Sequence, residues 1–396
     1  MANTLSVIDM VTREAQRIAH EKLTFIGTVD RQYDDSFART GAKIGQTLRI
    51  REPNQFTRRK GSRIMDVQDV TETTQNVTVA TQDGVDIRFN SSELALDIDE
   101  LSKRYIEPAV SVLVSGIEGD MLTSVTKDIY NVVGTAGTPA STAATAFDNI
   151  GLARAKLNQG LAPKDNNRFI QADSVTMSGL VKGMAGLFHD AEQIKEQYRE
   201  GLIGRSGMAD FFENERTYSH TVGSDVTTVT VNDSAIASGD KAITASGGNF
   251  KAGDVFTFAD VFAVHPETKI AYAHLQQFTA TADGTTALAF EPALISTGAK
   301  QNIDALPADS AAIVFVGTAN AVLRQNLMYH KEAFTFVTAD LPIMDDSIRC
   351  VRRVQDGLSL RCWQASDIRN DEMLLRLDIL YGFKTIRPAW ASRITN

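Results

Sequence analysis

The feature that most constrains this chain is a long, polar, strand-rich arm with a basic tip, which runs from about residue 44 to residue 89. Its strand-like runs are residues 47–51, 64–67, 77–80 and 85–89, and a turn-rich stretch at 53–63 separates the first two. A projecting hairpin is only marginally stable in water by itself. The arm therefore predicts another surface on which it lies, most simply a neighbouring copy of the chain.

The arm's tip carries a dense cationic cluster made of Arg58, Arg59 and Lys60, with Arg63 close by. A solvated loop, a contact with nucleic-acid phosphates and an ion-pair site between subunits all remain open for it. Only one aromatic residue, Phe56, lies nearby, whereas single-strand binders interleave several aromatics with their cations. We favour the contact between subunits, because a weak ion pair gains strength when it is repeated over a closed shell.

Length and charge limit the classes of protein to which this chain can belong. The chain has 396 residues, which predicts two or more domains. Its formal net charge is −9, whereas a general nucleic-acid binder carries a broad basic face. The N-terminal residues are polar and charged, and no stretch of 18 apolar residues occurs, so we expect neither a signal peptide nor a membrane span.

The two cysteines, Cys350 and Cys362, flank an Asp-Gly hairpin turn. A two-residue turn places Cys350 opposite Trp363 and Cys362 on the other face of the hairpin. A shift of one residue would instead place the two cysteines opposite each other. We favour two free thiols, because nothing in the sequence indicates export.

Periodicity predicts the regular elements outside the arm. Helices are expected at residues 4–22, 107–133, 147–159, 174–187, 190–199 and 319–328. Strands are expected at residues 333–339 and 373–381, and a hairpin at 350–361. The helix at 107–133 would be about 40 Å long, which suits a structural spine. The N-terminal helix either packs on its own domain or docks on a partner.

Residues 222–316 differ sharply in composition from the rest of the chain. They contain no Arg, Trp, Cys or Met, and four lysines against ten acidic residues leave a charge of −6. Short strand-like runs at 226–231, 254–258, 272–278, 287–290 and 313–316 alternate with Gly- and Asp-containing turns. This pattern predicts a small all-β domain, barrel-like or a sandwich, inserted into a loop of the host fold.

Catalytic motifs are missing from the sequence. The six histidines are scattered, and there is no metal-ligand spacing, phosphate-binding loop or nucleophile elbow. The neighbouring acids Asp345 and Asp346, like Asp97, Asp99 and Glu100, are better explained by a turn and a helix start. We therefore expect no enzyme activity, no catalytic residue, no metal and no cofactor.

The order of elements resembles that of the major capsid proteins of tailed bacteriophages, and in particular the coat proteins of short-tailed phages of the Salmonella-phage type. The residues that carry the resemblance are FIGTVDRQY at 25–33, GQTLRIR at 45–51, LSKRYIEPA at 101–109 and LYGFKTIRP at 380–388. The likeness covers nearly the whole chain. The order of the elements is specific to this family, whereas each short motif alone is weak.

The resemblance implies an α+β fold, which herpesvirus capsid floors and encapsulins share. It implies an N-terminal arm (1–43), an extended β-arm (44–96), a peripheral domain with the spine helix (97–148), an axial domain (149–221), an inserted β domain (222–316), and a completion of both host domains (317–396).

The resemblance further implies an icosahedral shell of hexamers and pentamers that matures by expansion. The implied partners are a scaffolding protein, a portal protein and loosely held double-stranded DNA. The implied location is the virion, after assembly in the host cytoplasm. An encapsulin-type compartment and a tail protein remain alternatives.

Overall fold

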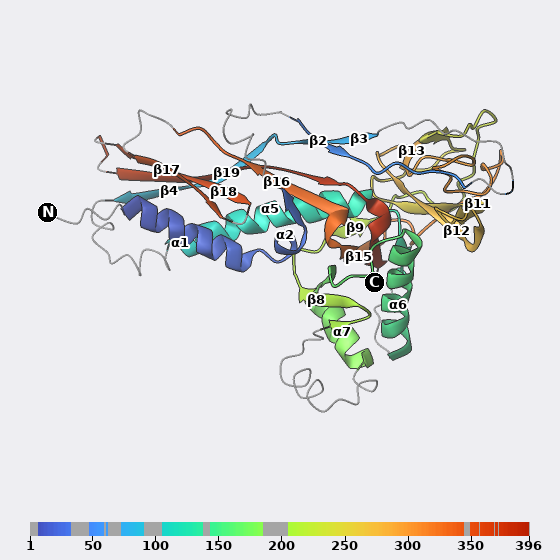
Figure 1. Cartoon of the computed structure of the whole chain (residues 1–396), viewed down its shortest axis with the longest axis horizontal. Coiled ribbons are helices and arrows are strands. Elements are labelled where there is room, and N and C mark those ends of the chain that lie inside the picture. Colours follow the sequence, from blue (N-terminus) through green and yellow to red (C-terminus); the bar gives the residue numbers. More distant parts are fainter. Residues whose placement is uncertain are drawn as a thin grey trace. The chain divides into compact units, whose positions relative to one another are not determined.

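A computed structural model of the chain describes residues 7–32, 47–58, 61, 73–90, 105–137, 143–184, 205–343, 349–355, 357–367, 369–370 and 372–395 (Figure 1). It divides into two compact units. Unit 1 comprises Met1–Arg51, Thr74–Met121 and Phe334–Lys384. Unit 2 comprises Glu52–Thr73, Leu122–Ala333 and Thr385–Asn396. No helix among the described residues has the length and apolar character needed to cross a membrane.

Unit 1 is built on a six-stranded sheet. Its strands are β1 (Asp30–Gln32), β16 (Phe334–Ala339), β19 (Glu372–Thr385), β18 (Leu358–Asp367), β17 (Arg349–Gln355) and β4 (Thr81–Asn90), which pairs with β19. The register of β17 and β18 places Cys350 opposite Trp363, as the two-residue turn predicts. Both cysteines are free thiols, and burial raises the pKa of Cys362 to about 11.

Three helices accompany this sheet: α1 (Val7–Lys22), α2 (Phe25–Thr28) and α5 (Glu107–Asp128). The helix α1 packs on β17 and β18 and buries Val11, Ala15 and Ile18, so it packs on its own unit. The buried carboxylate of Glu118 on α5 accepts hydrogen bonds from the backbone N–H groups of Phe25 (2.6 Å) and Ile26 (3.3 Å). These donors open α2, where backbone N–H groups lack helical partners.

The spine helix is shorter than expected. It ends at Asp128, and the last residues of the predicted span form the short strand β5 (Val132–Val133). In β5 both side chains are buried, and the strand pairs in parallel with β20 (Ala391–Thr395). Apolar residues at a helical spacing continue into β5, which is why the sequence alone does not mark the boundary.

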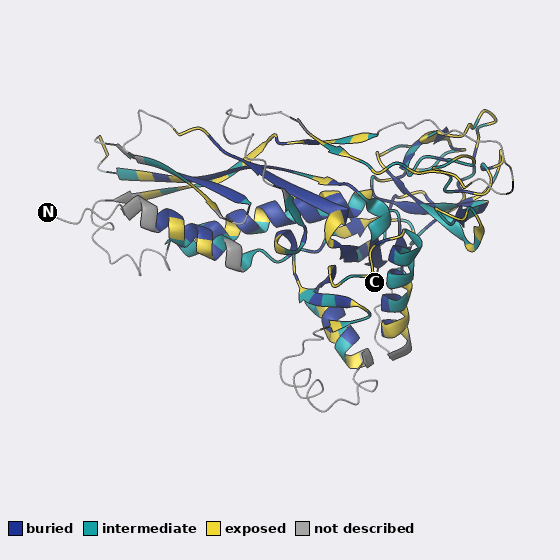
Figure 2. Cartoon of the chain, in the orientation of Figure 1, coloured by how far each residue is buried: buried dark blue, intermediate teal, exposed yellow. Residues whose placement is uncertain are grey.

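The described part of the arm contains a hairpin of β2 (Thr47–Arg51) and β3 (Thr74–Thr78), which form a two-stranded sheet. Arg49, Arg51, Asn76 and Thr78 are exposed, whereas Val77 is buried. Figure 2 shows exposed and half-buried colours along this hairpin. The predicted strand at 64–67 lies outside the described residues.

Unit 2 contains a seven-stranded sheet. Its strands are β5, β20, β15 (Val322–His330), β6 (Arg168–Ala172), β8 (Ala209–Glu213), β7 (Arg205–Ser206) and β9 (Ser219–Thr221), which pairs with β15. The helices α6 (Ala143–Gln159) and α7 (Ser174–Met184) pack together and share an apolar core with this sheet. The helices predicted at 147–159 and 174–187 are thus found, whereas the one predicted at 190–199 lies outside the described residues.

The helix predicted at 319–328 is wrong. These residues enter β15, which pairs with β20 on one side and with β6 and β9 on the other. From Gln325 to His330 every residue of β15 is buried. A strand that is covered on both faces loses the alternation of apolar and polar residues, and then reads like a helix.

Unit 2 also contains a five-stranded antiparallel sheet in the order β10 (Ala242–Thr244), β13 (Ala287–Glu291), β12 (Ala271–Ala280), β11 (Val255–Val264) and β14 (Ile313–Phe315). Four of the five predicted runs correspond to β11, β12, β13 and β14, whereas the run at 226–231 forms only isolated bridges and β10 was not predicted. Phe256, Phe258, Phe278 and Phe290 pack ring against ring at centroid distances of 5.2–5.9 Å. These four rings are fully buried and belong to the sheet's own apolar core.

Candidate functional site

The predicted basic tip is described only in part. Arg58 is exposed, at the end of a largely exposed stretch that begins at Pro53. Arg59, Lys60 and Arg63 lie outside the described residues, so the structure does not place the cluster as a whole. Phe56, two residues before Arg58, is 60% exposed.

The two ends of the segment that carries the tip are joined at its base. The Glu52 backbone N–H donates to the Thr73 carbonyl (2.9 Å), and the Thr73 hydroxyl donates to Glu52 Oε2 (2.8 Å). Lys300 Nζ, on a loop beyond β13, donates to the same hydroxyl (3.3 Å). The base of the segment that carries the tip is therefore hydrogen-bonded to Lys300 of the predicted insert, within unit 2.

A buried arginine on β20 joins three elements of unit 2. The Arg393 guanidinium donates to the Gly253 carbonyl (2.7 Å), the Lys127 carbonyl (3.0 Å) and the Thr279 hydroxyl (3.1 Å). Thr279 Oγ1 in turn donates to the Lys127 carbonyl (2.8 Å). Burial lowers the pKa of Arg393 to about 9, although the charges of Asp128 and Asp254 oppose that change. Arg393 therefore stays charged at neutral pH and holds the end of α5, β12 and β20 together.

A second buried pair, His220 and Asp254, lies where the chain enters the five-stranded region. His220 Nε2 lies 2.7 Å from Asp254 Oδ1. The other carboxylate oxygen accepts hydrogen bonds from the backbone N–H groups of Lys251 (2.7 Å) and Gly223 (3.2 Å). A side chain on Gly223 would collide with the Asn249 carbonyl, so this close approach requires glycine.

The amide side chain of Gln277 adds a further link between β12 and the rest of unit 2. Its Oε1 accepts from the Val132 N–H (3.1 Å) and its Nε2 donates to the Val132 carbonyl (3.0 Å). Gln277 thus satisfies the backbone N–H and carbonyl groups of Val132, as a neighbouring strand would otherwise do. Together with Arg393 and Asp254, it makes the attachment of the predicted insert polar and specific in geometry.

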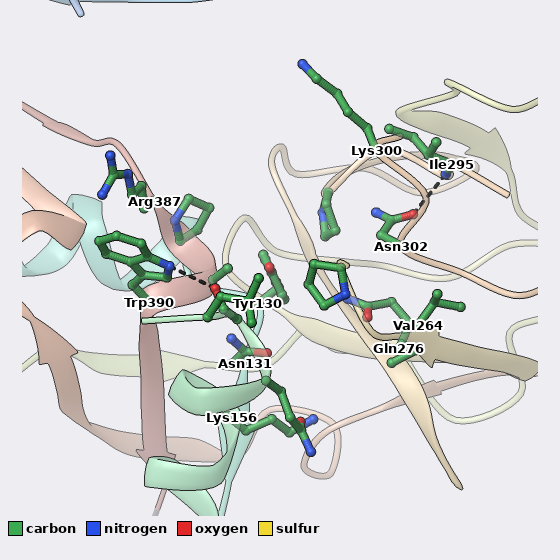
Figure 3. Close-up of a pocket in the computed structure, with 18 of the residues that line it drawn as sticks. Tyr130, Asn131, Lys156, Val264, Gln276, Ile295, Lys300, Asn302, Arg387 and Trp390 are labelled. Atoms are coloured by element: carbon green, nitrogen blue, oxygen red, sulfur yellow. Dashed lines mark hydrogen bonds between the residues drawn. The ribbon is translucent and has the colours of Figure 1, made fainter. Parts of the chain in front are cut away.

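A pocket of about 550 Å³ lies in unit 2 between α6, the 3₁₀ turn η4 (Pro388–Trp390) and the loops of the five-stranded sheet. Figure 3 shows Tyr130, Lys156 and Trp390 on one side, with Val264, Gln276 and Asn302 on the other. Trp390 Nε1 donates to the Gly160 carbonyl (2.8 Å), which fixes the indole against the end of α6. Burial lowers the pKa of Lys156 to about 8.

Unit 1 carries its own buried ion pair. Asp378 on β19 receives Arg361 Nη2 (2.5 Å) and Arg376 Nε (2.8 Å), one on each carboxylate oxygen. Arg361 and Asp378 are both buried, and they lie opposite each other on β18 and β19. The pair sits in the sheet rather than in a pocket, so it explains local pairing and offers no reactive group.

Residues 239–392 match the family described as P22 coat protein, gene protein 5. The solved structure of Mycobacterium phage Che8 is 12% identical, with a TM-score of 0.51, and the match covers 94% of this chain and 90% of that one. The mature capsid of bacteriophage PhiM1 gives 10% identity, coverages of 94% and 86%, and a TM-score of 0.43. The CUS-3 coat protein I-domain is 27% identical over 23% of this chain and 96% of that domain, with a TM-score of 0.20. Curated protein sequences give no match.

The chain has the fold of a tailed-phage major capsid protein. This agrees with the α+β class and with the resemblance noted in the sequence. The match to the coat-protein family begins within the predicted insert and extends to β20.

The residues that organise this capsid fold were mostly not found by sequence reasoning. Arg393 meets the Gly253 carbonyl from 140 residues away and His220 meets Asp254 from 34 residues away, and none of these residues belongs to a motif. The basic tip was predicted from its density of charge alone and stays a prediction. Among the described residues, no three His, Cys, Asp or Glu side chains are grouped so as to hold a metal ion.

Proposed function

We propose that this chain is the structural subunit of an icosahedral shell in a tailed bacteriophage. The single observation that carries the proposal is the match of residues 239–392 to a coat-protein family within a chain of capsid fold. In this proposal the chain assembles as hexamers and pentamers around a scaffolding protein, with a portal protein in the shell. Its role is structural rather than catalytic.

The arm supports assembly through contacts between copies. Its hairpin buries little of its own surface, and a two-stranded sheet of this kind gains stability when it lies on another surface. We propose that Arg58, Arg59, Lys60 and Arg63 contact a neighbouring subunit. Each ion pair would be weak alone, and repetition around a closed shell would make the contacts effective.

Charge supports the proposed content of the shell. The net charge of −9 gives an inner wall that does not hold nucleic acid tightly, so packaged double-stranded DNA could move along it. Free thiols suit assembly in a reducing host cytoplasm before the protein reaches the virion. Expansion on maturation would then require contacts with two stable arrangements.

We also propose the domain division expected from the sequence, with residues 222–316 as an insert in an axial domain. The insert's separate aromatic core supports this proposal. The polar attachment through Arg393, Asp254 and Gln277 supports a domain that folds on its own and is then held in place.

Electron microscopy tests the proposed function. The chain is expressed with its neighbouring genes, sized on a gradient and stained, and closed shells of uniform diameter are expected. Nucleic-acid content in mature particles distinguishes a virion shell from an encapsulin-type compartment, and tubes or rings would indicate a tail protein. A soluble species of small fixed size under every condition would overturn the proposal.

A further inference from the structure

The pocket of unit 2 contains a cation that lacks a counter-charge. Lys156 extends from the last turns of α6 into the pocket (Figure 3). Among the described residues, no carboxylate pairs with its ammonium group, and burial alone accounts for its lowered pKa. Burial, and to a lesser extent the charge of Lys156, lowers the pKa of the neighbouring His274. A partly buried ammonium group without a partner is energetically unfavourable, so the pocket is suited to an anion.

The other charged side chains that line the pocket already have partners. Arg387 pairs with Glu332 (2.8 Å) and stacks over the Trp390 ring at 4.1 Å. Lys300 donates to Thr73, which itself donates to Glu52. Lys300 is exposed to solvent and its partner is a neutral hydroxyl, whereas Lys156 is the half-buried cation of the described lining, and no carboxylate pairs with it.

We propose that this pocket binds a peptide segment of a partner protein in which a carboxylate side chain stands beside a proline or an aromatic residue, and that the Lys156 ammonium group holds the carboxylate. The proposal concerns unit 2 alone and does not depend on shell formation. It assigns a binding role to α6, η4 and the loops of the five-stranded sheet that line the pocket.

The walls of the pocket favour a peptide. Tyr130, Tyr272 and Trp390 supply aromatic surface, and Pro266 and Pro292 add rigid apolar edges. Flat aromatic walls with a few polar groups are typical of sites that accept proline or aromatic side chains. The tyrosine hydroxyls remain protonated at neutral pH, since burial raises the pKa of both Tyr130 and Tyr272, and they can donate to a carboxylate.

The charges favour a carboxylate over a phosphate. Phosphate sites usually bring several cations or backbone N–H groups to one point. This pocket offers one half-buried ammonium group, that of Lys156, whereas Lys300 is exposed. A single negative charge is therefore the better match, because the second charge of a phosphate would meet no further half-buried ammonium group among the described lining residues.

Tryptophan fluorescence reports on the pocket, because Trp363 and Trp390 are the chain's two tryptophans and only Trp390 lines it. The Trp363→Phe variant of the full chain is titrated with the probe acetyl-Pro-Glu-Phe-amide. The matched probe is acetyl-Pro-Gln-Phe-amide, and inorganic phosphate is the third. Calorimetric titration of the unaltered chain gives the same comparison if the variant is unstable.

We expect saturable binding of the glutamate peptide, with about tenfold weaker binding of the glutamine peptide and of phosphate. Lys156→Met should weaken the glutamate peptide about tenfold, whereas Lys182→Met, on the exposed part of α7, should leave it unchanged. Affinity should also fall about tenfold from pH 7 to pH 9, as Lys156 loses its proton.

Three results would overturn the proposal: no saturable change up to the peptide's solubility limit, equal affinity for the two peptides, or an affinity that Lys156→Met leaves unaltered. Tighter binding of phosphate would replace it with a phosphate site. Self-association of the chain that the glutamate peptide suppresses would support it, with a second copy as the source of the carboxylate.

Discussion

The five-stranded region of unit 2 and the β2–β3 hairpin of unit 1 are both antiparallel β structures, and they differ in what stabilises them. The first encloses a cluster of phenylalanine rings that are fully buried within its own sheet. The second exposes Arg49, Arg51 and Asn76. Apolar burial supplies most of a fold's stabilisation, so the first region can be stable by itself and the second needs a further surface. Substitutions in the first should change stability, and substitutions in the arm should change assembly.

The largest effect is expected from Phe256→Ala. Phe256 contacts four other aromatic rings, and its loss leaves a cavity in a core that cannot collapse around it. The free energy of unfolding of unit 2, measured by urea denaturation of the dissociated subunit, should fall by about 3–5 kcal/mol. Val314→Ala, at a side chain that is 58% exposed, is the control and should change it by about 0.5 kcal/mol or less. Equal effects of the two would contradict a self-sufficient core.

The next effect tests the attachment of the five-stranded region. Arg393→Met removes the donor to two backbone carbonyls and to the Thr279 hydroxyl. Buried acceptors without a donor are costly, so we expect a loss of about 2–4 kcal/mol in the same measurement. Arg205→Met removes a partly exposed pair with Asp210 and should cost about 0.5 kcal/mol. If the two variants unfold alike, the junction does not hold the region in place.

A smaller effect of opposite sign is expected at Lys156. Its pKa is 10.5 in the unfolded reference and about 8 in the folded chain, so the charged form opposes folding below pH 8. Lys156→Met should therefore raise the free energy of unfolding by about 1 kcal/mol at pH 7. The unaltered chain should gain stability between about pH 8 and pH 10.5, where only the unfolded state holds the proton. Consequently the difference in free energy of unfolding between Lys156→Met and the unaltered chain should shrink across that range. A difference that stays constant with pH would exclude desolvation of the Lys156 ammonium group as the reason for it.

The smallest effect on stability is expected in the arm. Arg58→Glu combined with Arg59→Glu should change the free energy of unfolding by about 0.5 kcal/mol or less, because Arg58 is exposed. Assembly of the proposed shell with the proposed scaffolding protein, followed on gradients and by electron microscopy, should nevertheless be impaired. Shells of normal yield from the double variant would remove the proposed role of the tip. Loss of stability in the monomer would remove the contrast between the two regions.

Local patterns in the sequence predicted those elements that have one buried face. The helix α6 covers the expected positions, because Ala146, Ile150, Ala153 and Leu157 are buried at the period of a helix. The opposition of Cys350 and Trp363 followed from turn length alone. The short strand β10 was missed because three residues carry no measurable period.

Tertiary structure decided the elements and sites in which distant residues meet. The strand β15 is buried on both faces, so its sequence has no alternation, and only its pairing with β6 and β20 makes it a strand. The junction of Arg393 with Gly253 and Lys127, and the pocket around Lys156, likewise combine side chains from separate parts of the chain. The sequence alone determined the composition of the regions, the periods of their elements and the location of the charged tip. Burial and the pairing of polar groups depend on the whole fold, because an isolated segment does not carry the surroundings that desolvate a charge or satisfy a hydrogen bond.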